Sequence, residues 1–282
     1  MTEPEPRYAL AQAAATPELE RLRMLEAIND PATKRRLDEI GVGEGWRCVE
    51  VGAGGGSIAH ALAQRVGPTG TVVAADMDPR FLQDLSAPNI EVARHDITQG
   101  PVPPADFDLA HCRAVLTHVH EPEEAAGHVL ASVRPGGTVF LEEPDYGAME
   151  PCDGDHPDAD LFLQYRDGFR SGQNMDGFAG RKVFKALQAA GCREIRSEAI
   201  TAIVHGGSLR ARYRRKTMEN VRERAIEGAY TPESFDRLLA LFDDPGFRYV
   251  DSLWVAVIAE RPGPSATAAA APNAGNPDSL AS

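Results

Sequence analysis

The sequence predicts an α/β fold built on a doubly wound, largely parallel sheet. A short run rich in β-branched residues meets a glycine-rich turn just after residue 50, and the turn leads into an alanine-rich helical segment. Strand and helix patterns then alternate as far as residue 142. Such alternation indicates parallel strands joined by right-handed crossovers, and sheets of this kind bind ligands at the carboxyl ends of their strands.

The N-terminal part predicts two helices before the first strand. We expect residues 1–15 to be mobile, because the chain begins with an acidic, proline-rich run. Thr16-Pro17 supplies an N-cap followed by proline at the first helical position. Asp30-Pro31 repeats this start signal for a second helix, which Gly41 ends.

The central part predicts five strands separated by helices or turns. Apolar runs bounded by glycine, proline and aspartate indicate the strands, and apolar residues at helical spacing indicate the helices. We expect a first strand around Val49 and Val51 and further strands over 71–75, 90–94, 107–112 and 138–142, with helices from Ile58 to about Val66 and over 121–133.

The C-terminal part is richer in helix. We expect helices over 158–169, 178–190, 208–228 and 231–242, a sixth strand over 193–205 and a seventh over 252–259. The run from 262 to 282 consists largely of Ala, Pro, Gly, Ser and Asn, so we expect a disordered tail. These patterns place a single domain over 16–261, with helical elements at 145–190 and 208–245 on the substrate side.

Composition narrows the classes of function. The 282-residue chain has a formal net charge of −13, which argues against a surface that wraps nucleic acid or binds an anionic membrane. Its four cysteines form no C-x-x-C pair and no zinc-ligand spacing, so we expect reduced thiols, no metal site and a cytoplasmic location. The chain contains neither a signal-peptide pattern nor an apolar run of transmembrane length.

The glycine-rich turn decides between two kinds of nucleotide site. Dinucleotide-binding enzymes use G-x-G-x-x-G/A, which places Ser57 where the third small residue should stand. Glu50 instead precedes glycines at every second position, Gly52, Gly54 and Gly56. This stretch resembles motif I of the class I S-adenosylmethionine (SAM)-dependent methyltransferases. The resemblance implies a Rossmann-like, seven-stranded sheet whose last strand is antiparallel.

Three further stretches resemble the ubiquinone/menaquinone-type branch of these enzymes. They are the fourth predicted strand with its continuation, residues 107–119, the Arg134-Pro135-Gly136-Gly137 turn, and the leading segment with Tyr8 and residues 18–22. Four landmarks at the right mutual spacing are more specific than one glycine turn. The resemblance covers roughly residues 8–141 together with the last strand.

The family resemblance assigns cofactor contacts to residues at the strand ends. Glu50 would organise the turn, while Gly52, Ala53, Gly54 and Gly56 would hold the methionine portion. Asp76 would bind the ribose hydroxyls with Met77 on the adenine face, and Asp96 would bind the adenine amino group with Ile97 against the ring. The backbone of His111, Cys112 and Arg113 would lie near the sulfonium. The alternative for Asp76 is a loop-starting role, and for Asp96 a turn-forming role.

Catalytic and substrate residues are expected beyond the fourth and fifth strands. His111 is the candidate general base, and a structural role for it, His118 and His120 is the alternative. Candidate substrate-pocket residues are Tyr8, Glu143, Asp145, Tyr146, Tyr165 and Phe169. Ordinary packing is the alternative for the aromatic residues. The basic cluster Arg210, Arg212, Arg214, Arg215 and Lys216 is expected to form a solvated helix face, because Glu219 and Glu223 share that face.

The sequence therefore predicts a cytoplasmic SAM-dependent methyltransferase that yields S-adenosylhomocysteine and methylates O, N or C of a small molecule. A quinone-like ring or a secondary metabolite would be the acceptor, with no nucleic acid or membrane partner and with a homodimer as a further expectation. One alternative is an NAD(P)-dependent oxidoreductase, which Ser57 and the lack of a Tyr-x-x-x-Lys pair disfavour. Another is a SAM-binding homologue that has lost methyl transfer.

Overall fold

A computed structural model describes residues 15–83, 85–171 and 175–263. The expectations for residues 1–14, including Tyr8, and for residues 264–282 lie outside this described part. Within it, no helix is both long and apolar enough to cross a membrane.

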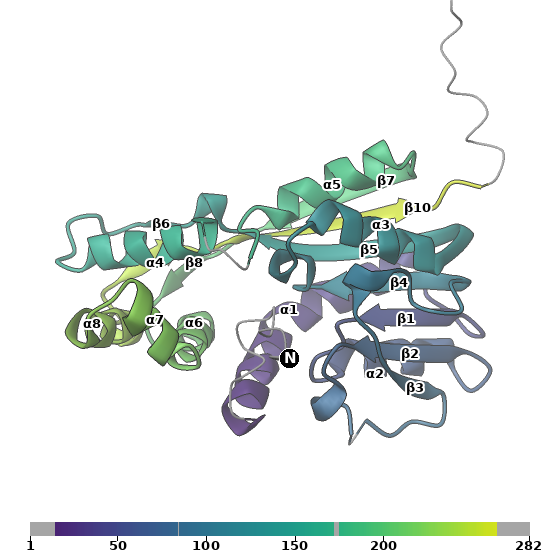
Figure 1. Cartoon of the computed structure of the whole chain (residues 1–282), viewed down its shortest axis with the longest axis horizontal. Coiled ribbons are helices and arrows are strands. Elements are labelled where there is room, and N and C mark those ends of the chain that lie inside the picture. Colours follow the sequence, from purple (N-terminus) through teal and green to yellow (C-terminus); the bar gives the residue numbers. More distant parts are fainter. Residues whose placement is uncertain (1–14, 84, 172–174, 264–282) are drawn as a thin grey trace, which may run out of the picture.

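A seven-stranded sheet forms the centre of the molecule (Figure 1). The strand order is β3-β2-β1-β4-β5-β10-β7, and β10 pairs antiparallel with both β5 and β7. This arrangement confirms the predicted doubly wound sheet with an antiparallel last strand. The bounds are β1 Arg47–Val51, β2 Thr71–Asp76, β3 Ile90–Arg94, β4 Phe107–Arg113, β5 Val133–Asp145, β7 Arg193–Ile200 and β10 Leu253–Glu260.

Helices cover both faces of this sheet. On one face α3 (Pro122–Ser132) and α5 (Ala179–Ala189) contribute buried residues such as Val129 and Val183 to one apolar core. On the other face α1 (Ala15–Ile40) and α2 (Ser57–Val66) contribute Leu37 and Leu62 to a second core. Short 3₁₀ turns follow four strands: η1 (Pro79–Phe81), η2 (Ile97–Gln99), η3 (Leu116–His118) and η4 (Tyr146–Ala148).

Helix α1 is continuous, which corrects the prediction of two N-terminal helices. Pro31 lies inside it, and the missing N–H of a proline removes one intrahelical hydrogen bond. Tertiary contacts on both sides of Pro31 hold the helix together. Asp30 pairs with Arg113 at 2.9 Å, and Thr33 donates a hydrogen bond to Glu142. Long-range contacts therefore outweigh the local stop and start signals.

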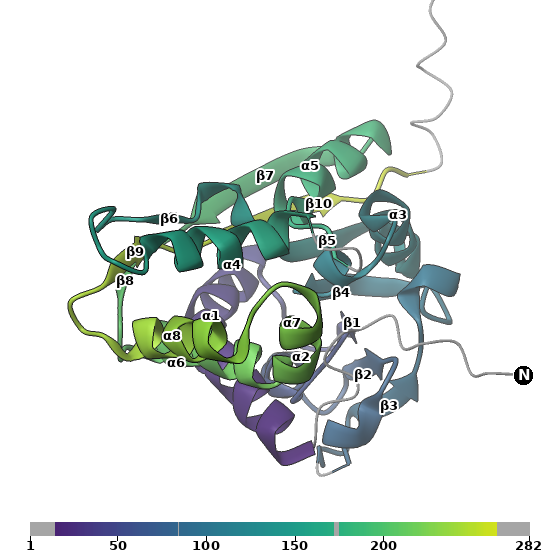
Figure 2. The ribbon, with the colours of Figure 1, turned by 60° about the vertical axis from the view of Figure 1, so that its left-hand side comes forward.

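A side lobe extends from one end of the sheet (Figures 1 and 2). It contains α4 (Ala159–Ser171), α6 (Leu209–Glu219), α7 (Arg222–Gly228), α8 (Pro232–Asp243) and a small sheet in the order β6-β9-β8. The strands of that sheet are β6 Glu150–Pro151, β8 Ile203–His205 and β9 Arg248–Val250. An aromatic cluster that includes Phe162, Tyr165, Phe242 and Tyr249 forms the core of the lobe.

The lobe corrects three predictions. The expected sixth strand divides into β7 and β8, which belong to different sheets, because the chain turns at Thr201 and Ala202 to pair with β9. The expected helix 208–228 divides into α6 and α7 at Asn220 and Val221. The small sheet itself was not predicted, since strands of two or three residues are too short for a periodic pattern.

The basic side chains of α6 differ in exposure, because some lie on the surface and one lies in the interior. Arg212 is exposed, but the Arg214 side chain is only 2% exposed, so the predicted solvated face is wrong for Arg214. Its guanidinium donates to Asp251 and to Ser252, both of which are buried. This ion pair joins α6 to the segment that leads into β10.

We predict that Arg214→Met lowers the free energy of unfolding by about 3 kcal/mol, because the variant leaves the buried Asp251 carboxylate without its Arg214 partner. Arg212→Met on the exposed side of the same helix is the matched control, with an expected change within about 0.5 kcal/mol. Urea unfolding followed by circular dichroism measures both. Equal losses in the two variants would contradict a structural role for the buried pair.

Candidate functional site

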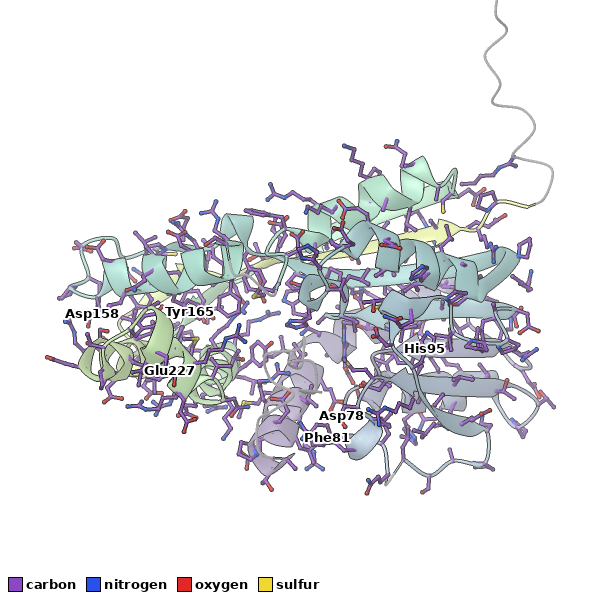
Figure 3. All side chains as sticks on the ribbon, in the orientation of Figure 1. Asp78, Phe81, His95, Asp158, Tyr165 and Glu227 are labelled. Carbon is purple, nitrogen blue, oxygen red and sulfur yellow. The ribbon has the colours of Figure 1, made fainter. Side chains whose placement is uncertain are left out.

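A cavity of about 960 Å³ lies at the carboxyl ends of the parallel strands. Its turn end is lined by residues 50–55, 57–58, 76–78, 80–81 and 94–99, with Glu26 of α1 against the turn. Its lobe end is lined mainly by Glu18, Arg21, Leu22, Leu25, Thr117, His118, Pro144, Tyr146, Phe169, Tyr213, Arg214, Thr217 and Trp254. Figure 3 labels Asp78, Phe81 and His95 near the turn end, and Tyr165 within the side lobe.

The glycine-rich turn after β1 brings bare backbone to the cavity. Gly52, Gly54 and Gly56 all have positive φ angles, a conformation that residues with a Cβ adopt only at a cost. A Cβ on Gly52 would also collide with a methyl group of Val115. The turn therefore requires glycine at position 52 for two independent reasons, backbone conformation and close packing.

Asp76 at the end of β2 fixes the turn from the neighbouring strand. One carboxylate oxygen accepts the N–H of Gly54 at 2.9 Å, and the other accepts the N–H of Asp78 at 2.9 Å. Burial raises the pKa of Asp76, and these backbone hydrogen bonds act in the opposite direction. An acidic side chain thus lies in the cavity wall beside bare backbone.

The segment after β3 supplies further residues that line the turn end of the cavity. The Asp96 carboxylate accepts hydrogen bonds from the backbone N–H and the hydroxyl of Thr98, so it caps η2 as its turn-forming alternative predicted. Ile97 is 4% exposed, whereas Met77 is 42% exposed at the rim. All three residues line the cavity, where their expected contacts with an adenine ring remain a prediction.

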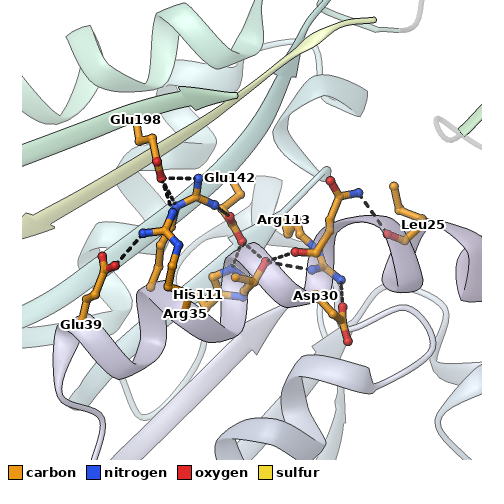
Figure 4. A network of polar contacts seen from close by, with 11 residues as sticks. Leu25, Asp30, Arg35, Glu39, His111, Arg113, Glu142 and Glu198 are labelled. Carbon is orange, nitrogen blue, oxygen red and sulfur yellow. Dashed lines mark hydrogen bonds and ion pairs between the residues drawn. The ribbon is translucent and has the colours of Figure 1, made fainter. Parts of the chain in front are cut away.

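His111 is buried, does not line the cavity, and lies between two carboxylates. Figure 4 shows it beside one of them, Glu142. Its Nδ1 is 2.6 Å from Glu50 and its Nε2 is 3.1 Å from Glu142. Burial opposes the charged imidazole, but the two carboxylates outweigh it and raise the pKa of His111 to about 9. Because the ring is fully buried and both nitrogens are engaged, the geometry contradicts its predicted role as general base.

The buried charges continue from His111 into α1. Burial alone would raise the pKa of Glu142, but the hydrogen bond and charge of His111 lower it. Arg36 donates to Glu142 and to Glu198, and Arg113 donates to Thr33 and Asp30 (Figure 4). This network ties β1, β4 and β5 to the helix that covers the cavity.

Other predicted site residues divide between the cavity and the interior. The cavity is lined by Glu50, Gly52, Ala53, Gly54, Asp76, Met77, Asp96, Ile97, Arg113, Tyr146 and Phe169. The side chains of Glu143, Asp145 and Tyr165 are buried away from the cavity, at 0%, 1% and 1% exposure, so their predicted contacts with a ligand are corrected to structural roles. The Cys112 side chain is also buried, and Gly56 is the N-cap of α2. The expected backbone contacts of these two residues with the cofactor remain a prediction.

Two buried acids illustrate those structural roles. Glu143 accepts hydrogen bonds from the backbone N–H groups of Val115, Leu116 and Thr117, which shapes the loop after β4. Burial raises the pKa of Glu143 to about 7 even though these hydrogen bonds oppose the shift. Asp145 forms an ion pair with Arg181 of α5. Tyr165 belongs to the aromatic core of the side lobe.

Sequence reasoning missed most of the lobe end. Leu22 and Leu25 of α1 line the cavity, although their helical spacing in the sequence is equally typical of core packing. Tyr213 and Trp254 also line it, and neither stands in a motif that distinguishes a ligand contact from packing. His118 faces the cavity, where burial and the nearby charge of Arg21 lower its pKa to about 3. It is therefore a neutral imidazole at physiological pH.

The described residues bring together no group of three or more His, Cys, Asp or Glu side chains that could hold a metal ion.

Comparison with known proteins shows a family. A family profile described as a methyltransferase domain matches residues 10–197. The chain is 25% identical over 201 residues to an uncharacterized 37.1 kDa protein in transposon TN4556 of Streptomyces fradiae, covering 70% of this chain and 57% of that protein. It is 32% identical over 115 residues to the ubiquinone/menaquinone biosynthesis C-methyltransferase UbiE of Pseudomonas putida, covering 38% and 45%. The chain thus spans about half the length of these relatives.

Solved structures share the fold. The Bacillus subtilis YcgJ protein aligns with a TM-score of 0.54 at 16% identity, over 82% of this chain and 99% of that one. A Haemonchus contortus phosphoethanolamine N-methyltransferase in complex with S-adenosylhomocysteine aligns with a TM-score of 0.50 at 15% identity, over 78% and 50%. At these identities the likeness concerns the sheet and its helices.

We predict that Gly52→Ala lowers the free energy of unfolding by about 1–3 kcal/mol, because it imposes a positive φ on alanine and a collision with Val115. Gly127→Ala in α3 is the control, since no atom lies within 4 Å of the added Cβ. This control should stabilise the helix by about 0.5–1 kcal/mol. Thermal and urea unfolding measure both variants, and a neutral Gly52→Ala would refute the packing argument.

We also predict a pH-dependent contribution from His111. Its pKa rises from 6.5 to about 9 on folding, so the stabilisation is complete below pH 6.5 and disappears as the pH rises through 9. Across that window, wild type should lose on the order of 2–3 kcal/mol relative to His111→Gln. Urea unfolding between these pH values measures the difference, with exposed His60→Gln as the control. If the free energy of unfolding depended on pH in the same way for wild type and His111→Gln, a charged His111 between Glu50 and Glu142 would be excluded.

Proposed function

The chain belongs to the methyltransferase-domain family, and from this premise we propose that it methylates a small molecule held at the lobe end of its cavity. The family match confirms the resemblance to class I SAM-dependent methyltransferases, with SAM as the cofactor. The NAD(P)-dependent oxidoreductase is accordingly not favoured. Whether the acceptor atom is O, N or C belongs to the proposal.

We assign the cofactor to the turn end of the cavity. The observation that carries this assignment is the Asp76 carboxylate, which lies 2.9 Å from the backbone nitrogen of Gly54 in the cavity wall. Bare backbone at Gly52 and Gly54 leaves room for the methionine portion, while an acid one strand away suits a pair of ribose hydroxyls. Met77, Asp96 and Ile97 would then surround the adenine.

The protein's part in the reaction is chiefly positional. SAM supplies a methyl group already activated on a sulfonium, so no residue has to create the electrophile. The two ends belong to one continuous cavity, so cofactor and acceptor would lie side by side with their reacting atoms aligned. His111 has no role in this proposal beyond holding Glu50 beneath the turn.

The lobe end favours a planar acceptor. Tyr146 and Phe169 stack with ring centroids 4.7 Å apart, and Tyr213 and Trp254 add two further aromatic surfaces. Aromatic walls with a few polar groups are typical of pockets for small organic ligands. Together with the partial similarity to a ubiquinone/menaquinone C-methyltransferase, this lining supports a quinone-like or phenolic ring as the acceptor.

Turnover with a panel of ring acceptors tests the proposal. Purified protein is incubated with SAM and hydroxylated quinones or phenols, and S-adenosylhomocysteine and the methylated product are quantified by mass spectrometry. Product whose formation depends on both protein and acceptor would support methyl transfer. Tight SAM binding without product across acceptors of every nucleophile class would favour the homologue that has lost methyl transfer.

We predict that Asp76→Ala weakens S-adenosylhomocysteine binding by about 1.5–3 kcal/mol, the range for a hydrogen bond to a charged group. Isothermal titration calorimetry measures the change. Asp106→Ala is the control, because Asp106 lies on the exposed surface and pairs with Arg47. Unchanged affinity in Asp76→Ala would remove the ribose assignment.

A further inference from the structure

The carboxylate of Glu26 lies directly over the glycine-rich turn, although it comes from α1 and belongs to no sequence motif. A Cβ built on Gly55 would collide with the Glu26 carboxylate, which supplies the three heavy atoms nearest to that Cβ. Both residues line the cavity. The backbone N–H of Ser57, the first residue of α2, hydrogen-bonds the Glu26 carboxylate. An acid is thus held at the point where the turn enters the helix.

The surroundings of Glu26 make it a site for a cation. Burial raises its pKa, and the neighbouring charge of Asp30 raises it further. Arg113 lies close enough to act in the opposite direction, but its guanidinium is engaged with Asp30 and Thr33. Within the described part of the chain, Glu26 has no ion-pair partner within 4.0 Å. A positively charged ligand group would stabilise the ionised form of a half-buried carboxylate of this kind.

We propose that Glu26 binds the α-ammonium group of the aminoacyl portion of the cofactor, and this rests on the proposed function. The glycine turn leaves space for the aminoacyl chain, and the Glu26 carboxylate borders that space from the α1 side. An ammonium placed there would donate a charge-assisted hydrogen bond to the Glu26 carboxylate, which no basic side chain of the described residues provides. Glu26 would then distinguish an aminoacyl nucleoside from a nucleoside without the amino acid.

The same contact would join the cofactor to the helix that borders both ends of the cavity. Helix α1 also contributes Arg21, Leu22 and Leu25 to the lobe end, so a bond from Glu26 to the cofactor holds the helix that covers both ends. Arg21 donates to the hydroxyl of Tyr213 on α6, which links α1 to the side lobe. Glu26 is therefore a binding residue whose position also orders the wall around the acceptor.

Calorimetry with two nucleosides tests the inference without an identified acceptor. The probes are S-adenosylhomocysteine and 5′-methylthioadenosine, which share the adenosine and the thioether sulfur but differ in the aminoacyl group. Glu26→Gln should weaken S-adenosylhomocysteine binding about 10- to 100-fold, the effect of losing a hydrogen bond between charged groups. Its affinity for 5′-methylthioadenosine should stay unchanged. Glu39→Gln on an exposed part of α1 is the matched control.

A second variant tests the same contact without removing the charge. Gly55 has no positive φ, so alanine is compatible with its backbone while displacing the Glu26 carboxylate. Gly55→Ala should therefore weaken S-adenosylhomocysteine binding selectively, and this result would stand even if Glu26→Gln folded poorly.

Three outcomes would overturn the inference: equal losses for both nucleosides, no loss for either, or tighter S-adenosylhomocysteine binding by Glu26→Gln. The last would mean that Glu26 repels the cofactor carboxylate. Wild-type protein that binds neither nucleoside would instead refute the proposed function.

Discussion

A charged histidine between two carboxylates is the interaction on which the site depends. His111 on β4 lies opposite Glu50 on β1 in the strand register, and its other nitrogen reaches Glu142 on β5. Buried charges are tolerated when they are paired and hydrogen-bonded, and here each carboxylate has the imidazolium as its partner. We call His111 and these two carboxylates the clamp. Because Glu50 lies two residues before Gly52, the clamp fixes the strand end from which the glycine-rich turn begins.

The clamp also determines where α1 lies. Arg36 and Thr33 complete the hydrogen bonds of Glu142, and Arg113 connects Thr33 to Asp30. These polar contacts hold α1, with its internal proline, against the strand ends. Apolar packing alone would leave the rotation of the helix about its axis poorly defined. The same helix then places Glu26 over the turn and Leu22 and Leu25 in the cavity. Fold and site therefore share one network.

The two ends of the cavity are built by different parts of the structure. The sheet supplies the turn end, with Asp76 and the bare glycine backbone, while α1 and the side lobe supply the aromatic lobe end. The lobe has its own core of aromatic side chains and its own buried ion pair between Arg214 and Asp251. The side lobe is therefore held together by interactions of its own, separate from those that fix the turn.

The sequence by itself determined a doubly wound sheet and the glycine-rich turn, because alternating periodicity and glycines at every second position are local patterns with local causes. The strand order came from the tertiary structure. The sequence also placed Asp76 and Asp96 at strand ends, where parallel strands bring them to one edge. Only the tertiary structure decided that His111 and Glu143 point into the interior, that Arg214 is buried, and that α1 continues through Pro31. Those outcomes depend on partners distant in the sequence, such as Val115, 28 residues from Glu143, and Glu142, 109 residues from Thr33. No spacing along the chain encodes which partner a side chain will meet.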